Sequence, residues 1–490
     1  MSNLSELLPS GGGQNEVEFV ASGSLSNGQT VILNSNGTVT AVAGSGSAES
    51  IPSGSSATFS SGTIYRAAVS FDPNTANKFV IAFTDGPNSG YGTAIIGTIS
   101  GSSITFGSKY VFLTAEVNAL FIAYDPNTAN KFVVVYRNGS NQGGSKVGTV
   151  SGTAISYSSE YIFNSSNSGE PCISFDPNTS GKFVIAYMDN TAARGKALIG
   201  TLSGTSISYG SDAIFNVGGT EIINVAYDPS TANKFVIVYK DGGNASKGTA
   251  IAGSVSGTSI TYGSEYVFNT ATTNQPNMSF DSNTAGKFVV AYYDGASSYG
   301  SSIVGTVSGT AISYGSSYVF NSAQTNRMSI AYDPNNNGKF AIAFRDAPST
   351  YYLSAIVGTV SGTAITYGSK STANTGASNY PSIAFDSNSS GKFVIGSQTS
   401  GTGQAVTGQI STLVTNLTST NLIGISAEAI TSGATGVINT WGGLNEGQSS
   451  LTPASIYYVQ ENGTISTVAT APAQKIGQAI SATTLNLKDL

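Results

Sequence analysis

Five acidic residues recur at matching positions along this 490-residue sequence and are the first candidates for chemistry. Each follows an apolar run and begins a polar, glycine-rich segment. A ring of carboxylates around a channel could hold a cation, and two acids about 5–10 Å apart in a cleft could hydrolyse a glycosidic bond. The five acids are Asp85, Asp189, Asp241, Asp294 and Asp346, and the matching positions of two further copies hold Asn138 and Thr399.

The plainer interpretation is that these acids open turns. An aspartate at the start of a loop accepts backbone N–H bonds, and glycine after it allows the chain to reverse. All five acids are equivalent by repeat, whereas a catalytic site normally departs from the symmetry of its scaffold. The sequence therefore favours turn formation, with a cation site and glycoside hydrolysis as alternatives.

Other side chains in the same segments could bind a ligand without catalysis. A tyrosine ring can stack on a sugar, although an exposed loop tyrosine is more often incidental. We predict a binding surface formed by these segments and no catalytic residue. Its candidate residues are the five acids together with Tyr91, Arg194, Tyr299, Tyr351 and Tyr352.

The composition excludes several familiar kinds of site. The sequence has no histidine, which removes Ser-His-Asp and Cys-His catalysis and the usual zinc sites. Its one cysteine, Cys172, begins an apolar run and is expected to be buried and inert. The net charge of −6 argues against nucleic acid as a partner, and no window is long and apolar enough for a membrane helix. We expect no cofactor and no metal ion.

A repeated phrase organises most of the chain. FDPNTANKFVIAF at 71–83 returns as YDPNTANKFVVVY at 124–136, and a lysine follows each aspartate by six positions. A fixed period of this size predicts a propeller, a solenoid or an array of beads. The seven aspartates, spaced by 51 to 53 residues, are Asp72, Asp125, Asp176, Asp228, Asp281, Asp333 and Asp386.

Each copy predicts four strands, and the ends of the array indicate that it closes. In one copy the strands are 224–227, 234–239, 249–257 and 259–268. The last copy leaves the pattern after Ser411 without a fourth strand, whereas an orphan fourth strand at 57–65 precedes the first copy. We expect this strand to pair near 404–411 and close a ring. The sequence thus predicts an all-β fold with a seven-bladed β-propeller over 55–411.

The Asp-Pro-Asn phrase is expected to form the tight turn between the first and second strands. Aspartate accepts the N–H groups of the turn, proline restricts φ, and asparagine or glycine adopts the left-handed conformation. Each turn has one carboxylate, whereas calcium loops of the EF-hand type have several. The phrase also loosely resembles the Asp-box of sialidases, without its Thr-Trp ending. A scaffold role is favoured, with calcium binding and a glycosidase relic as alternatives.

Residues 1–15 are expected to form a flexible or docking arm, and residues 16–50 and 413–490 also lie outside the repeats. TVILNSNGTVTAV at 30–42 and SIYYVQENGTISTV at 455–468 resemble each other, since both predict a hairpin with a glycine turn. Ring closure would bring both ends of the array to one blade. We therefore predict a small discontinuous β domain that carries the propeller as an insertion.

The terminal segments also carry a family resemblance. SELLPSGGGQNEVEFV at 5–20 and NLIGISAEAITSGATGVINTWGGLNEGQ at 421–448 resemble terminal modules of virion structural proteins from marine-type tailed bacteriophages, over about a quarter of the chain. In that group such modules frame varied central domains of tail-fibre-like or particle-surface proteins.

The resemblance implies a virion protein that is made in the host cytoplasm and anchored to the particle through its terminal domain. Its implied partners are other virion proteins, a host-surface glycan or protein, and further copies of itself. The propeller would then serve host adhesion. A propeller glycosidase or depolymerase acting on host glycans is the alternative.

Overall fold

The computed structural model describes residues 16–45, 56–347, 350–410, 414–460, 463–469 and 474–488. The predicted arm at 1–15 lies outside these ranges. The chain forms two compact units, one from residues near both chain ends and one from the repeats. Within the described ranges, no helix is long and apolar enough to cross a membrane.

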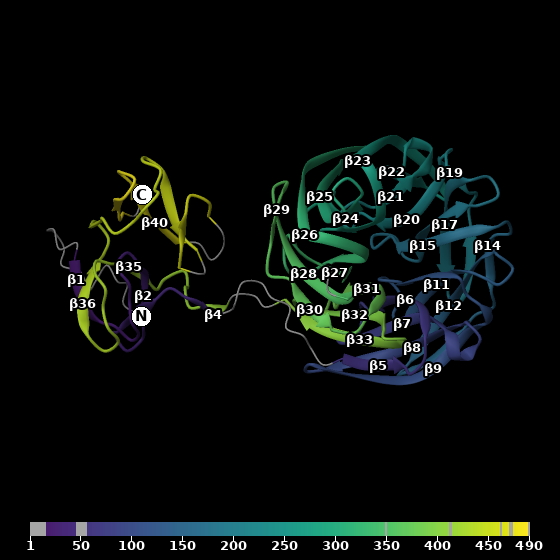
Figure 1. The fold of residues 1–490 in the computed structure, drawn as a ribbon, viewed down its shortest axis with the longest axis horizontal. Coiled ribbons are helices and arrows are strands. Elements are labelled where there is room, and N and C mark those ends of the chain that lie inside the picture. Colours follow the sequence, from purple (N-terminus) through teal and green to yellow (C-terminus); the bar gives the residue numbers. More distant parts are fainter. Residues whose placement is uncertain are drawn as a thin grey trace. The chain divides into compact units, whose positions relative to one another are not determined.

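The repeats form a ring of seven four-stranded antiparallel blades, which confirms the predicted fold class (Figure 1). In blade 1 the strands, from the channel outwards, are β6 (Ile64–Phe71), β7 (Lys78–Asp85), β8 (Tyr91–Ser100) and β9 (Ser103–Glu116). Blades 4, 5 and 6 are joined by two long strands, β23 (Ser259–Phe280) and β26 (Ala311–Tyr332), each of which is outermost in one blade and innermost in the next.

The remaining blades repeat this order. The other innermost strands are β10 (Ala119–Tyr124), β15 (Ser168–Phe175), β20 (Thr220–Tyr227) and β31 (Ser378–Phe385). The second strands are β11 (Lys131–Arg137), β16 (Lys182–Asp189), β21 (Lys234–Asp241), β24 (Lys287–Asp294), β27 (Lys339–Asp346) and β32 (Lys392–Thr399). The third strands are β12 (Gly143–Ser151), β17 (Arg194–Ser203), β22 (Lys247–Ser256), β25 (Tyr299–Ser308), β28 (Tyr352–Ser361) and β33 (Thr402–Gln409). Three outermost strands are split, into β13 (Ala154–Tyr157) and β14 (Tyr161–Asn164), β18 (Ser206–Tyr209) and β19 (Ala213–Asn216), and β29 (Ala364–Tyr367) and β30 (Ser371–Asn374). Two 3₁₀ turns, η2 (Gly86–Asn88) and η3 (Gly242–Asn244), follow β7 and β21.

Blade 7 is completed by a strand from the other end of the repeats. β5 (Ser56–Ser60) pairs antiparallel with β33, with Ala57 opposite Ala405 and Ser60 opposite Gly403. The predicted ring closure is therefore confirmed. The strand is shorter than the predicted 57–65, because the chain turns after Ser60 and Ile64 already begins the innermost strand of blade 1.

The Asp-Pro-Asn turns hold neighbouring blades together at one end of the channel. Their aspartates are buried, 0% to 2% exposed. Asp386 Oδ1 accepts a hydrogen bond from Asn388 N in its own turn at 2.9 Å, and its Oδ2 accepts one from Asn77 N of blade 1 at 2.7 Å. Asp176 Oδ2 accepts one from Asn233 N of blade 4 at 3.0 Å in the same way. These carboxylates are hydrogen-bonded to backbone amides, which is the scaffold role.

Polar side chains along the channel make further hydrogen bonds from blade to blade. Ser382 Oγ accepts a hydrogen bond from Val69 N at 3.0 Å, and Ser70 Oγ accepts one from Tyr124 N at 3.2 Å. Buried backbone N–H groups without a partner are costly. These side chains accept hydrogen bonds from innermost-strand amides of the neighbouring blade. These polar side chains of the channel wall therefore join neighbouring blades.

Each blade is compacted by a phenylalanine that packs on a glycine. A Cβ atom added to Gly200 in β17 would lie 2.1 Å from Cζ of Phe183 in β16, far inside contact distance. Since such an atom would be 2.0 to 2.2 Å from the ring in all seven blades, only glycine fits at this position. The pairs are Gly97–Phe79, Gly148–Phe132, Gly200–Phe183, Gly253–Phe235, Gly305–Phe288, Gly358–Phe340 and Gly408–Phe393.

The unit built from both chain ends contains two five-stranded sheets. One has the order β1 (Glu16–Val20), β36 (Thr435–Asn439), β35 (Leu422–Ser426), β2 (Thr30–Leu33), β3 (Val39–Ala41). The other has the order β37 (Leu444–Asn445), β41 (Leu485–Asn486), β40 (Gln474–Ala479), β38 (Ile456–Val459), β39 (Ile465–Ser466), and β4 (Gly44–Ser45) pairs separately with β34 (Val414–Thr415). Both predicted hairpins are present, β2–β3 and β38–β39, with Gly37 and Gly463 in left-handed backbone. Strands from the two chain ends thus share a sheet and a core.

Replacement of Gly200 by alanine should destabilise the propeller by about 1–3 kcal/mol, because the new methyl group collides with Phe183 in a packed core. Gly139→Ala is the matched control, since its Cβ would lie 3.7 Å from Ala115 Cβ at an exposed position. Thermal unfolding should show a lower Tm for Gly200→Ala and little change for the control. Equal Tm values for the two variants would contradict the packing described here.

Candidate functional site

A β-bulge interrupts the innermost strand in six of the seven blades. Pairing with the second strand shifts register, for example between Gly169 and Cys172 in blade 3 and between Glu221 and Asn224 in blade 4. A bulge bends the strand and redirects a side chain. In five blades the bulge holds a residue with φ between 38 and 53: Glu170, Ile222, Gln275, Arg327 and Tyr380.

These residues occupy one position of the repeat, six residues before the turn aspartate. We name the seven residues at this position the mouth ring. They differ in charge, size and polarity, whereas the turns at the other end of the channel are nearly constant. A left-handed conformation costs a non-glycine residue about 1–2 kcal/mol, and such strain tends to occur at functional sites. The mouth ring consists of Arg66, Ala119, Glu170, Ile222, Gln275, Arg327 and Tyr380.

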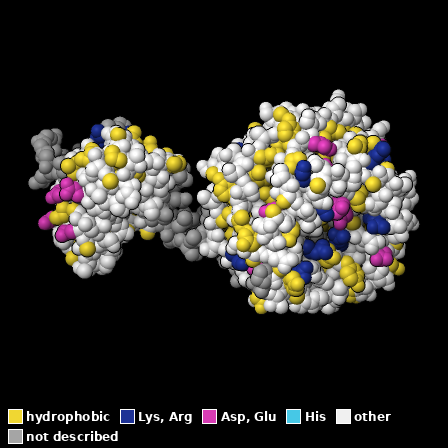
Figure 2. Space-filling view, turned by 45° about the horizontal axis from the view of Figure 1, so that its top comes forward, with side chains coloured by type: hydrophobic (Ala, Val, Ile, Leu, Met, Phe, Trp, Pro, Cys, Tyr) yellow, Lys and Arg dark blue, Asp and Glu magenta, His cyan; other side chains and the backbone are white. Residues whose placement is uncertain are grey.

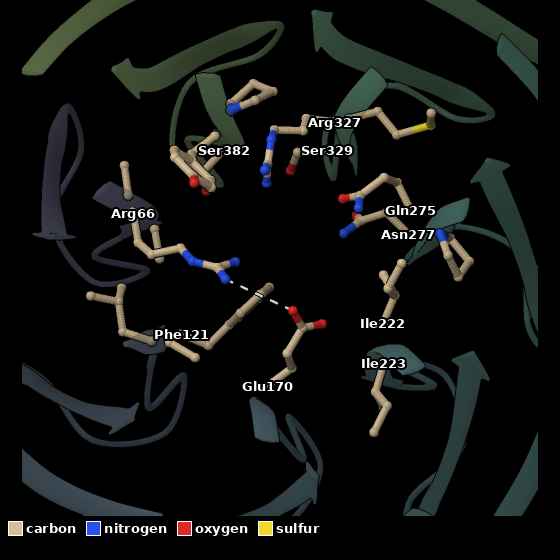
Figure 3. A pocket seen from close by; sticks show the side chains of 18 of the residues that line it. Arg66, Phe121, Glu170, Ile222, Ile223, Gln275, Asn277, Arg327, Ser329 and Ser382 are labelled. Carbon is tan, nitrogen blue, oxygen red and sulfur yellow. Dashed lines mark ion pairs between the residues drawn. The ribbon is translucent and has the colours of Figure 1, made fainter. Parts of the chain in front are cut away.

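The mouth ring surrounds a cavity of about 140 Å³ at the end of the channel where each innermost strand begins. Figure 3 shows Arg66, Glu170 and Arg327 reaching toward its centre from different blades. Asn277 and Ser329, which lie two residues further along their strands, also line the cavity. Side chains from every blade therefore meet at one opening.

Charged and aromatic groups meet within the mouth ring. Arg66 Nη2 lies 3.8 Å from Glu170 Oε1, across the small side chain of Ala119. Both side chains are partly exposed, at 35% and 40%, so solvent screening keeps the contribution of this ion pair below about 1 kcal/mol. The Tyr380 ring centroid lies 5.2 Å from Cζ of Arg66 and 4.2 Å from Cζ of Arg327, whose blades flank its own. These cation–π contacts hold both guanidinium groups near the cavity.

A second variable position lies beside the mouth ring, twelve residues after each turn aspartate. Cζ of Arg345 at this position lies 3.8 Å from the Tyr351 ring centroid. Burial lowers the pKa of Arg345; Tyr351 opposes this shift, and the positive charge of Arg327 adds to it. We name these seven residues the outer mouth ring: Thr84, Arg137, Met188, Lys240, Tyr293, Arg345 and Gln398.

The five predicted acids follow the outer mouth ring by one residue and lie outside the cavity. All but Asp294 are buried, 1% to 5% exposed. Asp241 Oδ1 accepts hydrogen bonds from Asn216 Nδ2 and Gly243 N, both at 3.1 Å. Asp346 and Asp85 accept hydrogen bonds from Lys370 Nζ at 2.7 Å and Lys109 Nζ at 3.0 Å. Their carboxylates are hydrogen-bonded within the protein, and none of the five lines the cavity.

Asp189 has several hydrogen-bond and ion-pair partners within its own blade. Its Oδ1 accepts hydrogen bonds from Thr191 N and Ala192 N, and its Oδ2 lies 2.9 Å from Lys196 Nζ. Burial would raise the pKa of Asp189, but the hydrogen bond and charge of Lys196, together with the two amides, outweigh burial and lower it. This carboxylate stabilises its loop in the ionised form.

The other five predicted residues lie at or beside the start of the third strands, outside the cavity. Tyr91, Arg194, Tyr299 and Tyr352 each begin a third strand. Tyr351 reaches inward and contacts Arg345. The structure therefore places the predicted surface on the same face as the mouth, but farther from the channel axis.

The mouth ring is not among the binding residues predicted from the sequence, although the repeats contain a signal for it. An alignment of the seven copies shows that the residue six positions before the aspartate varies among basic, acidic, amide, aliphatic and aromatic types. That residue comes before a short apolar strand, so from sequence alone it is assigned to the loop between two blades. Cys172, by contrast, is 1% exposed, in agreement with the prediction of burial.

Comparisons with known proteins add the fold alone. No family model and no curated protein sequence matches the chain. Among solved structures it is similar to Chaetomium thermophilum Sqt1 bound to the N-terminus of ribosomal protein L10, with 11% identity and a TM-score of 0.46 over 72% of this chain and 98% of that chain. It is also similar to Saccharomyces cerevisiae Sqt1, with 9% identity and a TM-score of 0.44 over 75% and 100%. For Aleuria aurantia lectin in complex with alpha-methyl-L-fucoside the values are 12% and 0.43 over 64% and 97%. The strand pairing itself defines the chain as a seven-bladed β-propeller protein with a charged cavity at one mouth.

Asp189→Asn should destabilise the protein in a pH-dependent manner. Because the folded pKa of Asp189 is lowered, the stabilisation from its charge is complete above its unfolded pKa, about 3.9, and is lost as the pH falls through the folded value. At pH 7 we expect the variant to lose about 1–3 kcal/mol of unfolding free energy. Unfolding measured from pH 7 to pH 3 should show the difference from the native protein closing below about pH 4.

Lys196→Met removes the same ion pair from the other side, together with the pair that Lys196 forms with Asp212 at 2.8 Å, and its destabilising effect should likewise shrink as the pH falls. A difference in stability that stays constant from pH 7 to pH 3 for both variants would contradict the electrostatic account.

Proposed function

We propose that this chain is a bacteriophage virion structural protein that recognises the host surface through the mouth of its propeller. The observation that carries the recognition role is the distribution of variation among the blades. At one end of the channel the turns are nearly identical and buried in contacts between blades. At the other end, the mouth ring and the outer mouth ring each hold six different residue types in seven blades. A rigid scaffold with one variable face is the arrangement that recognition requires.

The attachment role is assigned to the unit built from both chain ends. The terminal segments resemble modules that frame varied central domains in phage particle proteins, and their strands form one unit that is separate from the propeller. A common attachment unit combined with a varied recognition unit is consistent with such a role. Further copies of the chain on one particle would multiply weak contacts into avidity.

One observation favours a second candidate function, the hydrolysis of surface glycans. Glu170 and Glu221 line the same groove beside the mouth, and the equivalent positions of the other blades hold no acid. Glycoside hydrolysis needs one carboxyl group that keeps its proton, usually in an apolar setting. Here Glu170 pairs with Arg66 at 3.8 Å and Glu221 pairs with Lys240 at 3.0 Å, so a cation lies beside each carboxylate and neither has an apolar setting. The surroundings of this acid pair therefore support binding over catalysis.

The recognition face can be tested with two matched triple variants of the full chain. One places glutamates on the loops after the second strands, at Ala192, Ala296 and Ala347. The other places glutamates on the opposite turns, at the exposed residues Ala76, Ala129 and Ala232. Both variants change the net charge by the same amount. Fluorescently labelled protein should lose binding to host cells with the first variant and keep it with the second.

The opposite result, binding lost only with the turn variant, would overturn the assignment of the face. Mass spectrometry of purified particles, separated into heads and tails, should detect the native chain, and its absence from particles would refute the virion role. Release of reducing sugar from host polysaccharide by the native protein, abolished in Glu221→Gln, would support the hydrolase instead.

A further inference from the structure

Positive charge is concentrated at the propeller mouth. The chain has 20 lysines and arginines in 490 residues, and four of its five arginines occupy the two mouth rings. Arg66 and Arg327 belong to the mouth ring, and Arg137 and Arg345 belong to the outer mouth ring. In Figure 2, Lys and Arg side chains gather near the middle of the visible face of the propeller. A chain with a net charge of −6 thus presents a positive opening.

Two of these arginines have no acidic counterpart among the described residues. Arg66 pairs with Glu170, whereas neither Arg327 nor Arg345 forms an ion pair there. Nε of Arg345 is also buried without a hydrogen-bond partner. Cations held close together repel one another, and a buried donor without an acceptor is costly. The repulsion is relieved when an anion binds in the cavity beside Arg327, which lines it.

The cavity wall supplies further hydrogen-bond donors. Ser382 Oγ accepts a hydrogen bond from Val69 N at 3.0 Å, and Ser329 Oγ accepts one from Ile383 N at 3.2 Å. A hydroxyl that accepts in this way still has its own hydrogen to donate. Asn277 likewise accepts through Oδ1 from Ile330 N at 3.3 Å, which leaves its Nδ2 group. Among the described residues, none of these hydrogens has an acceptor, so each is available to a ligand in the cavity.

We propose that the mouth cavity binds an oxyanion carried on a sugar of the host surface: a carboxylate, sulfate or phosphate group. Arg327 is the principal ligand, because its guanidinium reaches into the cavity and has no competing carboxylate. Planar guanidinium groups bind such oxyanions through two parallel hydrogen bonds. Arg66 and the hydroxyls of Ser329 and Ser382 complete the site. Tyr380 positions the two arginines, and Glu170 competes with the ligand for Arg66.

This inference names the class of ligand for the site in the proposed function and rests on that proposal. The direct test is titration calorimetry of the full chain with D-glucuronate, D-glucose 6-sulfate and D-glucose 6-phosphate. D-glucose is the neutral counterpart, and inorganic sulfate and phosphate at equal ionic strength distinguish a free ion from one carried on a sugar. At least one charged sugar should bind about tenfold or more tightly than D-glucose and than either inorganic ion.

Three variants of the full chain are expected to weaken, strengthen and leave unchanged the affinity for the charged sugar. Arg327→Ala should weaken binding of the charged sugar about tenfold or more. Glu170→Gln should strengthen it by up to about fivefold, since it frees Arg66 from an exposed ion pair. Arg194→Ala removes the fifth arginine, which lies outside the cavity, and should leave binding unchanged. A gain in Glu170→Gln cannot arise from misfolding, so the set remains informative if Arg327→Ala is unstable.

Equal binding of D-glucose and all three charged sugars would overturn the proposal, and so would equal losses in Arg327→Ala and Arg194→Ala. Binding of inorganic ions as tight as that of the sugars would reject a glycan ligand. If charged sugars do not bind but the loop-face glutamate variant still loses its binding to host cells, the recognition role stands and only the ligand class is wrong. If charged sugars bind but Arg327→Ala keeps full binding to host cells, the adhesive role of the mouth fails instead.

Discussion

The structure depends on the hydrogen bonds that join each innermost hairpin to the next blade. At the turn end, a buried aspartate such as Asp386 accepts an amide of its own turn and an amide of the neighbouring turn. Along the channel, Ser70 and Ser382 accept amides of adjacent innermost strands. The bond within the turn is present in all seven copies, and Asp176 also repeats the bond to the neighbouring turn, so the turns must keep the same shape. This constraint explains why the repeat is nearly invariant at that end.

The same constraint leaves the other end of each hairpin free to differ. Once the turn end and the Gly–Phe contacts hold a blade in place, the start of its innermost strand can accommodate a bulge and a left-handed residue. Ile222 is the clearest case, since a β-branched side chain at φ 49 is strained and is held there by the rest of the blade. Strain and variation thus coincide where side chains from all seven blades surround one cavity. Recognition is concentrated at the mouth because the scaffold is fixed at the turns.

The candidate site was only partly predictable, for reasons that individual residues show. Asp189 and Asp241 attract notice because acids recur, yet recurrence here reflects a turn that every blade needs, and their carboxylates bind amides and side chains within the protein. Arg66, Glu170 and Tyr380 belong to different repeats and lie far apart in the sequence. Their contacts exist because ring closure brings blades 7, 1 and 3 around one opening. A residue that varies among repeats is easily read as part of a loop, although variation at one fixed position is itself a sign of binding.

The sequence by itself determined the number of blades, the four strands of each, and the closing of the ring by a strand from the other end. Those features follow from local periodicity, turn chemistry and the count of repeats, which depend on neighbouring residues. Tertiary structure alone decided the exact end of the closing strand at Ser60, the bulges of the innermost strands and the meeting of Arg327, Arg345 and Tyr380 at the mouth. These features depend on distances between blades, and such distances are set by how seven sheets pack around an axis.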